Sequence, residues 1–331
     1  MNDIMKVFVN KRIPEIGIKL LEQEGLEVLF PKNEILSHEE WLSYCRNVDA
    51  ILSIGNDFKY NKEFFEACPN VKAIALYSVG FDHVDIKEAT QKHVPIGNTP
   101  DVLSRATSDV AFLLMQSVAR RASYNFQKVK EGKWGTFDPL HALGQELYGK
   151  TLGILGLGRI GFEMAKKSQK AFDMEIIYHN RHRNEEAEKE LGAAYVSFEE
   201  LIERSDVLSV HANFTPEQKD LFNSSVFEKM KSNAIFINTA RGGFQNEKDL
   251  YEALASKQIW GAGLDVTNPE PMSEKDPLLE LSSVCVLPHI GSATMEARNG
   301  MARLAAENII AFSRGEKMPH CANPKVYSDT I

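Results

Sequence analysis

Short apolar runs rich in β-branched residues alternate with segments of helical period from the start of the chain. This alternation is typical of βαβ units built around a parallel sheet. In the first third of the chain it predicts strands over 5–9, 27–30, 50–54 and 71–77, and helices over 16–24, 39–46 and 62–68. Ser37 and Asn61 stand before the second and third helices as plausible N-caps. We therefore expect a small α/β sheet here.

A turn cluster over 97–101 ends this sheet and opens a long helix with apolar periodicity. Asp101 can cap that helix, which should run to about Ala122. A domain boundary is expected at this turn, between residues 99 and 100. The segment 124–149 gathers aromatic residues without a clear period, so it either covers a core edge or forms a subunit interface.

The alternation resumes more regularly in the second half of the chain. It predicts strands over 151–155, 174–178, 207–211, 234–238, 260–264 and 284–287, with intervening helices such as 247–256. Several of these strands are nearly continuous apolar runs, which indicates that both of their faces are covered. A last helix over 293–314 most simply packs back on the first sheet. The chain then divides into residues 1–99 plus 291–331 and residues 100–290.

The composition of the 331-residue chain narrows the class of protein. With 43% hydrophobic and 25% charged residues it is globular and long enough for two domains, not disordered or held by a disulfide framework. A net charge of −8 disfavours nucleic acid and anionic membranes as partners. The expected partner is a small molecule.

The cysteines and the apolar stretches bear on location. Cys45, Cys68, Cys285 and Cys321 form no CxxC pair, which predicts reduced thiols and no metal site. Residues 1–8 do not resemble a signal peptide, and the longest uncharged apolar-rich stretch, 110–119, is too short to span a bilayer. A soluble, cytoplasmic protein is expected.

A glycine motif marks the first site. Gly156, Gly158 and Gly161 form a GxGxxG that directly follows the strand at 151–155 and opens a helix to about residue 171. The first glycine permits a tight turn, the second lets the backbone approach a pyrophosphate, and the third lets helix and strand pack closely. The diphosphate of a dinucleotide would lie on the helix N-terminus.

The end of the next strand predicts which dinucleotide is preferred. NAD-binding units normally place an acidic residue there for the ribose hydroxyls, and this chain has Asn180, flanked by Arg181 and Arg183. A carboxylate would repel a 2′-phosphate, whereas these residues would accept one. NADP(H) is therefore favoured over NAD(H), which remains possible.

Three polar residues follow later apolar strands, where an open α/β sheet binds its ligand. They are Arg241, Glu270 and His289. A His beside a carboxylate is a tunable proton donor near neutral pH, and an Arg fork suits a substrate carboxylate. Taken singly, Arg241 is also consistent with a surface charge, Glu270 with a loop acid between prolines, and His289 with a turn histidine.

Six motifs, in order, resemble those of the D-isomer-specific 2-hydroxyacid dehydrogenase family, and within it the glyoxylate/hydroxypyruvate reductases. They lie at 78–82, 98–103, 156–161, 238–242, 263–266 followed by Pro-Glu-Pro at 269–271, and 288–294. The resemblance covers about 77–319, and the first 70 residues match only in pattern. It implies two flavodoxin- or Rossmann-like α/β domains with parallel sheets and an active site in the interdomain cleft. Residues 1–99 plus 291–331 would form the substrate-binding domain, and 100–290 the dinucleotide-binding Rossmann domain.

The resemblance also implies roles for the site residues. Arg241 would bind the substrate carboxylate and keto oxygen, His289 would protonate that oxygen, and Glu270 would keep His289 protonated. Backbone of Val79 and Gly80 would hold the carboxylate. Further contacts to the cofactor would come from Thr107, Arg159, Ile160, His211, Thr239, Ala240, Asp265 and Gly291, with Asp265 orienting the nicotinamide carboxamide.

The resemblance predicts an NADPH-preferring reductase of glyoxylate or hydroxypyruvate, assembled as a homodimer on the nucleotide domain. Two departures are visible: Asn213 replaces a common Pro near the adenine, and His141 stands nearest to a Trp that reaches the partner's pocket in similar reductases. The more polar pocket admits a longer acid such as 2-ketogluconate.

Other classes are open at this point. A cofactor-sensing corepressor-like binding protein shares the fold and the triad, but it would need a peptide groove or a regulatory tail. Phosphoglycerate dehydrogenases share the motifs but would need room for a C-terminal regulatory domain. Formate dehydrogenases would be expected to have Gln in place of Glu270.

Overall fold

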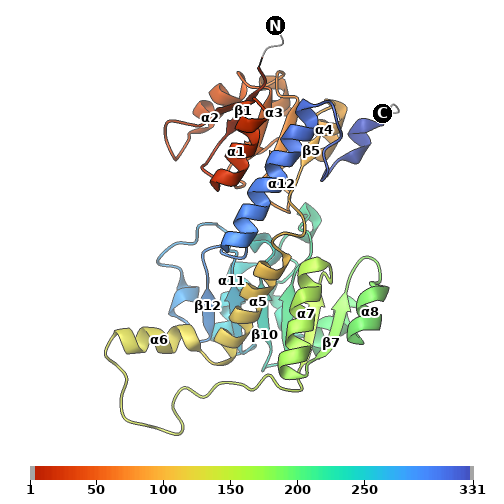
Figure 1. Cartoon of the computed structure of the whole chain (residues 1–331). Coiled ribbons are helices and arrows are strands. Elements are labelled where there is room, and N and C mark those ends of the chain that lie inside the picture. Colours follow the sequence, from red (N-terminus) through yellow and green to blue (C-terminus); the bar gives the residue numbers. More distant parts are fainter. Residues whose placement is uncertain (1–3, 329–331) are drawn as a thin grey trace. The chain divides into compact units, whose positions relative to one another are not determined.

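The computed structural model describes residues 4–328 and divides into two compact units. Unit 1 comprises the described part of Met1–Leu103 and Ala293–Ile331, and unit 2 comprises Ser104–Ser292. The outermost residues of the expected first domain, 1–3 and 329–331, lie outside the described residues. Figure 1 shows both units and labels many of their helices and strands.

Unit 1 is built on a five-stranded parallel sheet with strand order β2-β1-β3-β4-β5. This is the order of a flavodoxin-like doubly wound sheet. The strands are β1 Lys6–Val9, β2 Glu27–Leu29, β3 Ala50–Ser53, β4 Ala73–Leu76 and β5 Ile96–Gly97. Every residue of β3 and β4 is buried, as expected for strands covered on both faces.

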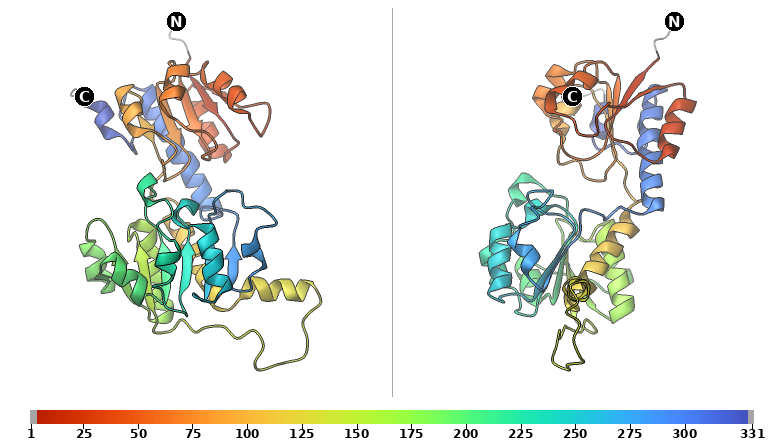
Figure 2. Two further views of the ribbon diagram at one scale, coloured as in Figure 1. Left: turned by 180° about the vertical axis from the view of Figure 1, so that it is seen from behind. Right: turned by 90° about the vertical axis from the view of Figure 1, so that its left-hand side faces the viewer.

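Helices cover both faces of the sheet of unit 1. They are α1 Glu15–Gln23, α2 His38–Cys45, α3 Lys62–Ala67, α4 Ile86–Gln91 and α12 Met295–Ser313, followed by a 3₁₀ turn at Pro324–Tyr327. Ser37 and Asn61 cap α2 and α3 through their side chains, as predicted. The last long helix, α12, packs beside α1 and against β3 and β4, so two segments far apart in the sequence lie side by side (Figures 1 and 2).

Unit 2 contains a seven-stranded parallel sheet with strand order β12-β11-β10-β9-β6-β7-β8. The strands are β6 Thr151–Leu155, β7 Glu175–His179, β8 Ala194–Tyr195, β9 Val207–Val210, β10 Ile235–Asn238, β11 Gly261–Leu264 and β12 Val284–Val286. The order reverses between β6 and β9, which is the switch point of a Rossmann-type sheet. The prediction of an α/β fold with two parallel sheets is confirmed.

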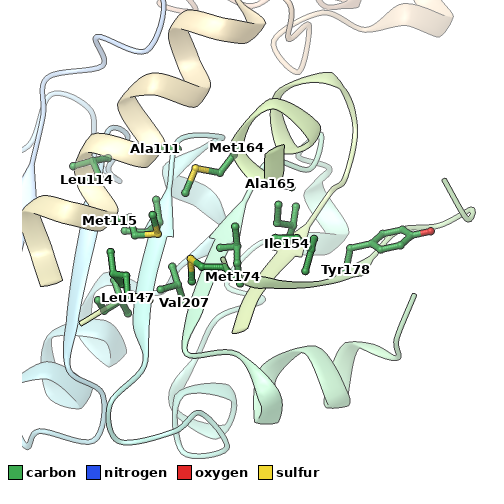
Figure 3. Close-up of a cluster of buried hydrophobic side chains, with 14 of the residues drawn as sticks. Ala111, Leu114, Met115, Leu147, Ile154, Met164, Ala165, Met174, Tyr178 and Val207 are labelled. Atoms are coloured by element: carbon green, nitrogen blue, oxygen red, sulfur yellow. The ribbon is translucent and has the colours of Figure 1, made fainter. Parts of the chain in front are cut away.

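Two apolar cores lie on opposite faces of this sheet. Because side chains alternate along a strand, Ile154 and Ile176 face one side of the sheet, covered by α5 (Ser104–Ala119) and α7 (Arg159–Phe172). Leu155 and Ile177 face the other side, covered by α9 (Phe198–Arg204), α10 (Ser224–Phe227) and α11 (Glu247–Ala255). Figure 3 shows the first core, and Figure 2 shows helices on both sides of the sheet. The helices of unit 2 are α5 Ser104–Ala119, α6 Ala122–Lys130, α7 Arg159–Phe172, α8 Glu185–Leu191, α9 Phe198–Arg204, α10 Ser224–Phe227 and α11 Glu247–Ala255, with 3₁₀ turns at Pro216–Gln218, Gly242–Phe244 and Pro277–Glu280.

The region after α5 differs from the prediction. The expected helix to about Ala122 ends at Ala119, because Arg121 takes a left-handed conformation (φ 50°) that breaks the helix. A second helix, α6, then begins at Ala122 within a stretch that showed no clear period. None of its side chains is buried.

No helix within residues 4–328 combines the length and the apolar character that crossing a membrane requires.

Candidate active site

The glycine loop between β6 and α7 has the shape that a diphosphate requires. Gly156 has a φ of 95°, and a Cβ there would lie 2.4 Å from the backbone nitrogen of Ala212. Gly158 is the N-cap of α7 and has no side-chain cap, and within residues 4–328 no atom beyond its own turn lies within 4 Å of where a Cβ would be. The first turn of α7, which contains Arg159 and Ile160, therefore offers backbone N–H groups beside open space, and a dinucleotide diphosphate fits there.

The segment after β7 is tied to this loop. Asn180 accepts a hydrogen bond from the Leu157 N–H at 2.7 Å and donates to the Leu157 carbonyl at 3.4 Å. Arg181 is exposed, and the Arg183 guanidinium forms an ion pair with Glu188 at 2.5 Å. The sequence placed these residues at a ribose 2′ position but did not indicate that Asn180 supports the glycine loop or that Arg183 has a carboxylate partner.

His211 and Thr239 lie at the ends of the neighbouring strands β9 and β10. The Oγ of Ser209 and the Nε2 of His211 are hydrogen-bonded at 2.8 Å, and Thr239 Oγ1 lies 3.4 Å from His211 Nδ1. Burial lowers the pKa of His211 to about 3, so its imidazole is neutral at physiological pH. A neutral ring at this strand end adds no charge to the site.

Arg241 is carried on a turn that a buried asparagine shapes. Asn238, at the end of β10, donates to the Arg241 carbonyl at 2.8 Å and accepts from the Ala240 N–H at 2.8 Å. A Cβ at Gly242 would lie 2.1 Å from the Thr267 carbonyl oxygen, so this turn touches the loop after β11. The turn that presents Arg241 is therefore fixed at both ends.

His289 and Glu270 form the polar pair of the site. His289 Nδ1 lies 2.5 Å from Glu270 Oε1, and about half of the His289 side chain and a third of the Glu270 side chain are exposed. They come from the loops after β12 and β11, which are neighbouring strands, and Arg241 follows β10. The structure thus brings His289 and Glu270 into contact and places Arg241 after the adjacent strand.

Asp265 supports the turn that carries His289. It is 1% exposed, and its two carboxylate oxygens accept hydrogen bonds from the N–H groups of Ile290 at 2.8 Å and Gly291 at 2.7 Å. Burial raises the pKa of Asp265 above its ordinary value. Thr107 of α5 lies beside Gly291, within 3.4 Å of where a Cβ would be. The turn is therefore held from β11 and α5.

Glu247 is a supporting residue that the sequence did not single out. Its carboxylate, at the start of α11, accepts the Asn268 N–H at 2.5 Å and so anchors the loop that carries Glu270. Burial raises the pKa of Glu247. An acidic residue in the first turn of a helix is common on any surface, so nothing in the sequence marks this anchor.

Val79 and Gly80 lie on a loop of unit 1, after β4. The Asn98 side chain donates to the Val79 carbonyl at 2.9 Å, and the Ser78 hydroxyl donates to the Gly80 carbonyl at 2.7 Å. These bonds fix the backbone that the family resemblance assigns to the substrate carboxylate. His141 is exposed on the segment between α6 and β6 of unit 2, and Asn213 is exposed after β9.

The chain is similar to known 2-hydroxyacid dehydrogenases in both sequence and structure. The NAD binding domain of the D-isomer specific 2-hydroxyacid dehydrogenases matches residues 112–291. A glyoxylate reductase from Thermococcus litoralis is 44% identical over 329 residues, covering 98% of each chain. A crystal structure of a glyoxylate reductase from Paecilomyes thermophila has a TM-score of 0.86 at 32% identity, covering 98% of this chain and 99% of that one.

A third relative was solved with ligands. It is an NADPH-dependent glyoxylate/hydroxypyruvate reductase from Sinorhizobium meliloti in complex with NADP and malonate. Its TM-score is 0.82 at 28% identity, covering 96% of both chains. The similarity to each of these three relatives extends over nearly the whole chain.

Proposed function

Because the chain belongs to the D-isomer specific 2-hydroxyacid dehydrogenase family, we propose that it reduces glyoxylate or hydroxypyruvate to the D-2-hydroxy acid with NADPH. It is an NAD(P)-dependent oxidoreductase by this membership. The observation that carries the proposal is the His289–Glu270 pair at 2.5 Å on the loops after β12 and β11, with Arg241 after the adjacent strand β10. Relatives that are named glyoxylate reductase, at 44% and 41% identity, support a small 2-keto acid as the substrate.

The proposed reaction uses the pair as a proton source. Arg241 binds the carboxylate of the keto acid through its planar fork and polarises the keto oxygen. His289, protonated and hydrogen-bonded to Glu270, donates its proton to that oxygen as the carbon is reduced. Glu270 orients the ring through Nδ1, which directs Nε2 toward the substrate. Asp265 keeps the His289 turn in place.

NADPH, when bound, supplies the hydride. Gly156, Gly158 and Gly161 would receive its diphosphate at the N-terminus of α7, and Thr239 and Ala240 would border the site after β10. Asn180 and Arg181 follow β7, on the other side of the glycine loop. Positive charge there favours a cofactor that carries a 2′-phosphate.

A longer 2-keto acid such as 2-ketogluconate is an alternative substrate within the same reaction. His141 is polar where the resemblance leads one to expect Trp, so a hydroxylated chain would find a hydrogen-bonding partner. A panel of glyoxylate, hydroxypyruvate, pyruvate and 2-ketogluconate, each followed by NADPH and NADH oxidation at 340 nm, ranks these substrates and both cofactors.

The decisive test of the roles is kinetic. Arg241→Ala and His289→Ala should each lower kcat/KM for the best substrate about a thousandfold, because each removes a charged group that the transition state needs. Nucleotide affinity, measured by calorimetry, should remain. Arg241→Lys keeps the charge without the fork and should show a raised KM. Lys248→Ala, at an exposed site on α11, is the control for effects of substitution and purification, and it should retain wild-type kcat/KM. Near-normal activity in either alanine variant would refute the roles.

A homodimer on the nucleotide-binding unit belongs to this proposal. The segment 120–148 exposes several large apolar side chains, namely Phe126, Val129, Trp134, Phe137, Leu140, Leu143 and Tyr148. A second copy of the chain is the partner that would cover them. The cytoplasmic location expected from the sequence stays a prediction.

A further inference from the structure

The loop that carries Arg181 and Arg183 is pinned at both ends to the glycine loop. Before it, Asn180 accepts the Leu157 N–H at 2.7 Å, and after it, Asn184 donates to the Leu157 carbonyl at 2.9 Å. Asn184 is also the N-cap of α8. The two arginines therefore project from a short, fixed loop beside the diphosphate site.

Arg183 is not an isolated cation. Its Nε donates to Glu188 Oε1 at 3.0 Å and its Nη2 donates to Oε2 at 2.5 Å, which is a bidentate pair. The guanidinium also lies 6.0 Å from the centre of the Tyr195 ring. The pair is therefore neutral as a unit, and its geometry is set by three contacts.

Glu188 is itself held from the core side. The Tyr178 hydroxyl donates to Glu188 Oε1 at 2.5 Å, and the Asn184 N–H donates to that hydroxyl at 2.8 Å. Figure 3 shows Tyr178 at the edge of the buried cluster, with its hydroxyl pointing away from the other labelled side chains. Hydrogen bonds from Arg183 and Tyr178 lower the pKa of Glu188, so the carboxylate is ionised at neutral pH. Its side chain is only 19% exposed.

We propose that Glu188 limits the preference for NADPH over NADH by neutralising Arg183, and that Arg181 supplies the cation for the 2′-phosphate. Arg181 is exposed on the same fixed loop. The Glu188 carboxylate is hydrogen-bonded to Arg183, so it neutralises Arg183 and not Arg181. A guanidinium that is paired with a carboxylate attracts a phosphate less than an unpaired one, because the carboxylate cancels its charge. This inference rests on the proposed use of NADPH. It identifies Glu188 as the residue that sets how strongly NADPH is preferred over NADH.

The test compares two probes that differ only in the phosphate. Calorimetric Kd values of the full chain for 2′,5′-ADP and 5′-AMP give a ratio that reports the 2′-phosphate alone, independent of turnover. In Glu188→Gln, Arg183 becomes available, and the affinity for 2′,5′-ADP should rise about fivefold to tenfold while that for 5′-AMP stays constant. In Arg181→Ala the affinity for 2′,5′-ADP should fall about tenfold or more.

A double variant separates neutralisation from positioning. The double variant Arg183→Ala with Glu188→Gln replaces one neutral pair of side chains by another. Its ratio of Kd values for 5′-AMP and 2′,5′-ADP should therefore equal that of the wild type. If Arg183 were the phosphate ligand and Glu188 only positioned it, the double variant and Glu188→Gln would both lose the preference, which would overturn the inference. Unchanged 5′-AMP affinity in each variant shows that the site is folded.

The two proposals fail separately. A wild type that binds both probes equally refutes the NADPH preference, yet a gain of preference in Glu188→Gln would still support the role of Glu188. A wild type that prefers 2′,5′-ADP, with no tightening in Glu188→Gln, refutes only the role of Glu188. In both cases reduction of keto acids with NADH reports separately on the proposed reaction.

Discussion

At the residue scale, His211 shows how a polar residue beside the site affects stability. Its pKa is lowered to about 3 by burial, whereas the unfolded chain has an ordinary value near 6.5. As the pH falls below that value, the unfolded state binds a proton that the folded state does not. Stability should therefore fall by up to about 1.4 kcal/mol per pH unit until the pH approaches 3.

The prediction is tested with His211→Asn. This variant has no imidazole at position 211 that protonates on unfolding, so the drop in the thermal unfolding midpoint between pH 7 and pH 5 should be smaller than in the wild type. His182→Asn, at an exposed position, is the matched control and should retain the wild-type drop. Equal drops in His211→Asn and the wild type would show that the histidine does not titrate on unfolding.

Individual site residues were predictable where a residue type has a known chemical use at a strand end. Arg241, Glu270 and His289 follow apolar strands, and the structure puts His289 in contact with Glu270. Glu188 was not predictable, because an acidic residue on a short helix is usually a solvated charge. Only the folded chain shows that its carboxylate lies between Tyr178 and Arg183.

At the element scale, the contact between α1 and α12 depends on a glycine. A Cβ at Gly17 would lie 2.7 Å from the carbonyl oxygen of Ala302, and this oxygen belongs to the backbone of α12. Replacing a helical glycine by alanine normally stabilises a helix by about 1 kcal/mol. Here a side chain at position 17 would force the helices apart.

Gly17→Ala should therefore destabilise unit 1 by about 1–3 kcal/mol, the usual range for overpacking. Thermal and urea unfolding measure the loss, and 5′-AMP binding in unit 2 should be unaffected. Lys19→Ala, an exposed position on the same helix, is the control and should change stability little. An unfolding midpoint that is unchanged or raised in Gly17→Ala would show that the helices can separate without cost.

Elements were predictable in proportion to how much of their surface is buried. Strands such as β6 and β10 are buried on both faces and read as continuous apolar runs, so their positions were found to within their end residues. Helix α6 buries no side chain, and it begins after Arg121, which provides no side-chain cap. Its start at Ala122 depends on the left-handed Arg121, which a sequence pattern does not show.

At the scale of the whole molecule, the segment 120–148 is the feature that the isolated chain leaves unexplained. In Figures 1 and 2 it projects from the rest of unit 2. Trp134 is 81% and Phe137 is 93% exposed. A helix of nine residues with no buried side chain is marginal in water, so α6 needs a partner surface. The aromatic content of the segment is typical of the core of a protein–protein interface. The segment is also long enough to supply the roughly 20–30 residues that each partner contributes to an interface of standard size.

The dimer prediction follows from this exposure. Sedimentation equilibrium should give the wild type twice the chain mass of 37.2 kDa. Trp134→Glu combined with Phe137→Glu places two charges in the apolar patch, and the dimer should weaken at least about a hundredfold because each charge must lose water on association. Ile35→Glu replaces a side chain that is 89% exposed on unit 1 and should leave the dimer intact. A monomeric wild type, or a double variant that stays dimeric with its 5′-AMP affinity preserved, would assign these side chains to another role.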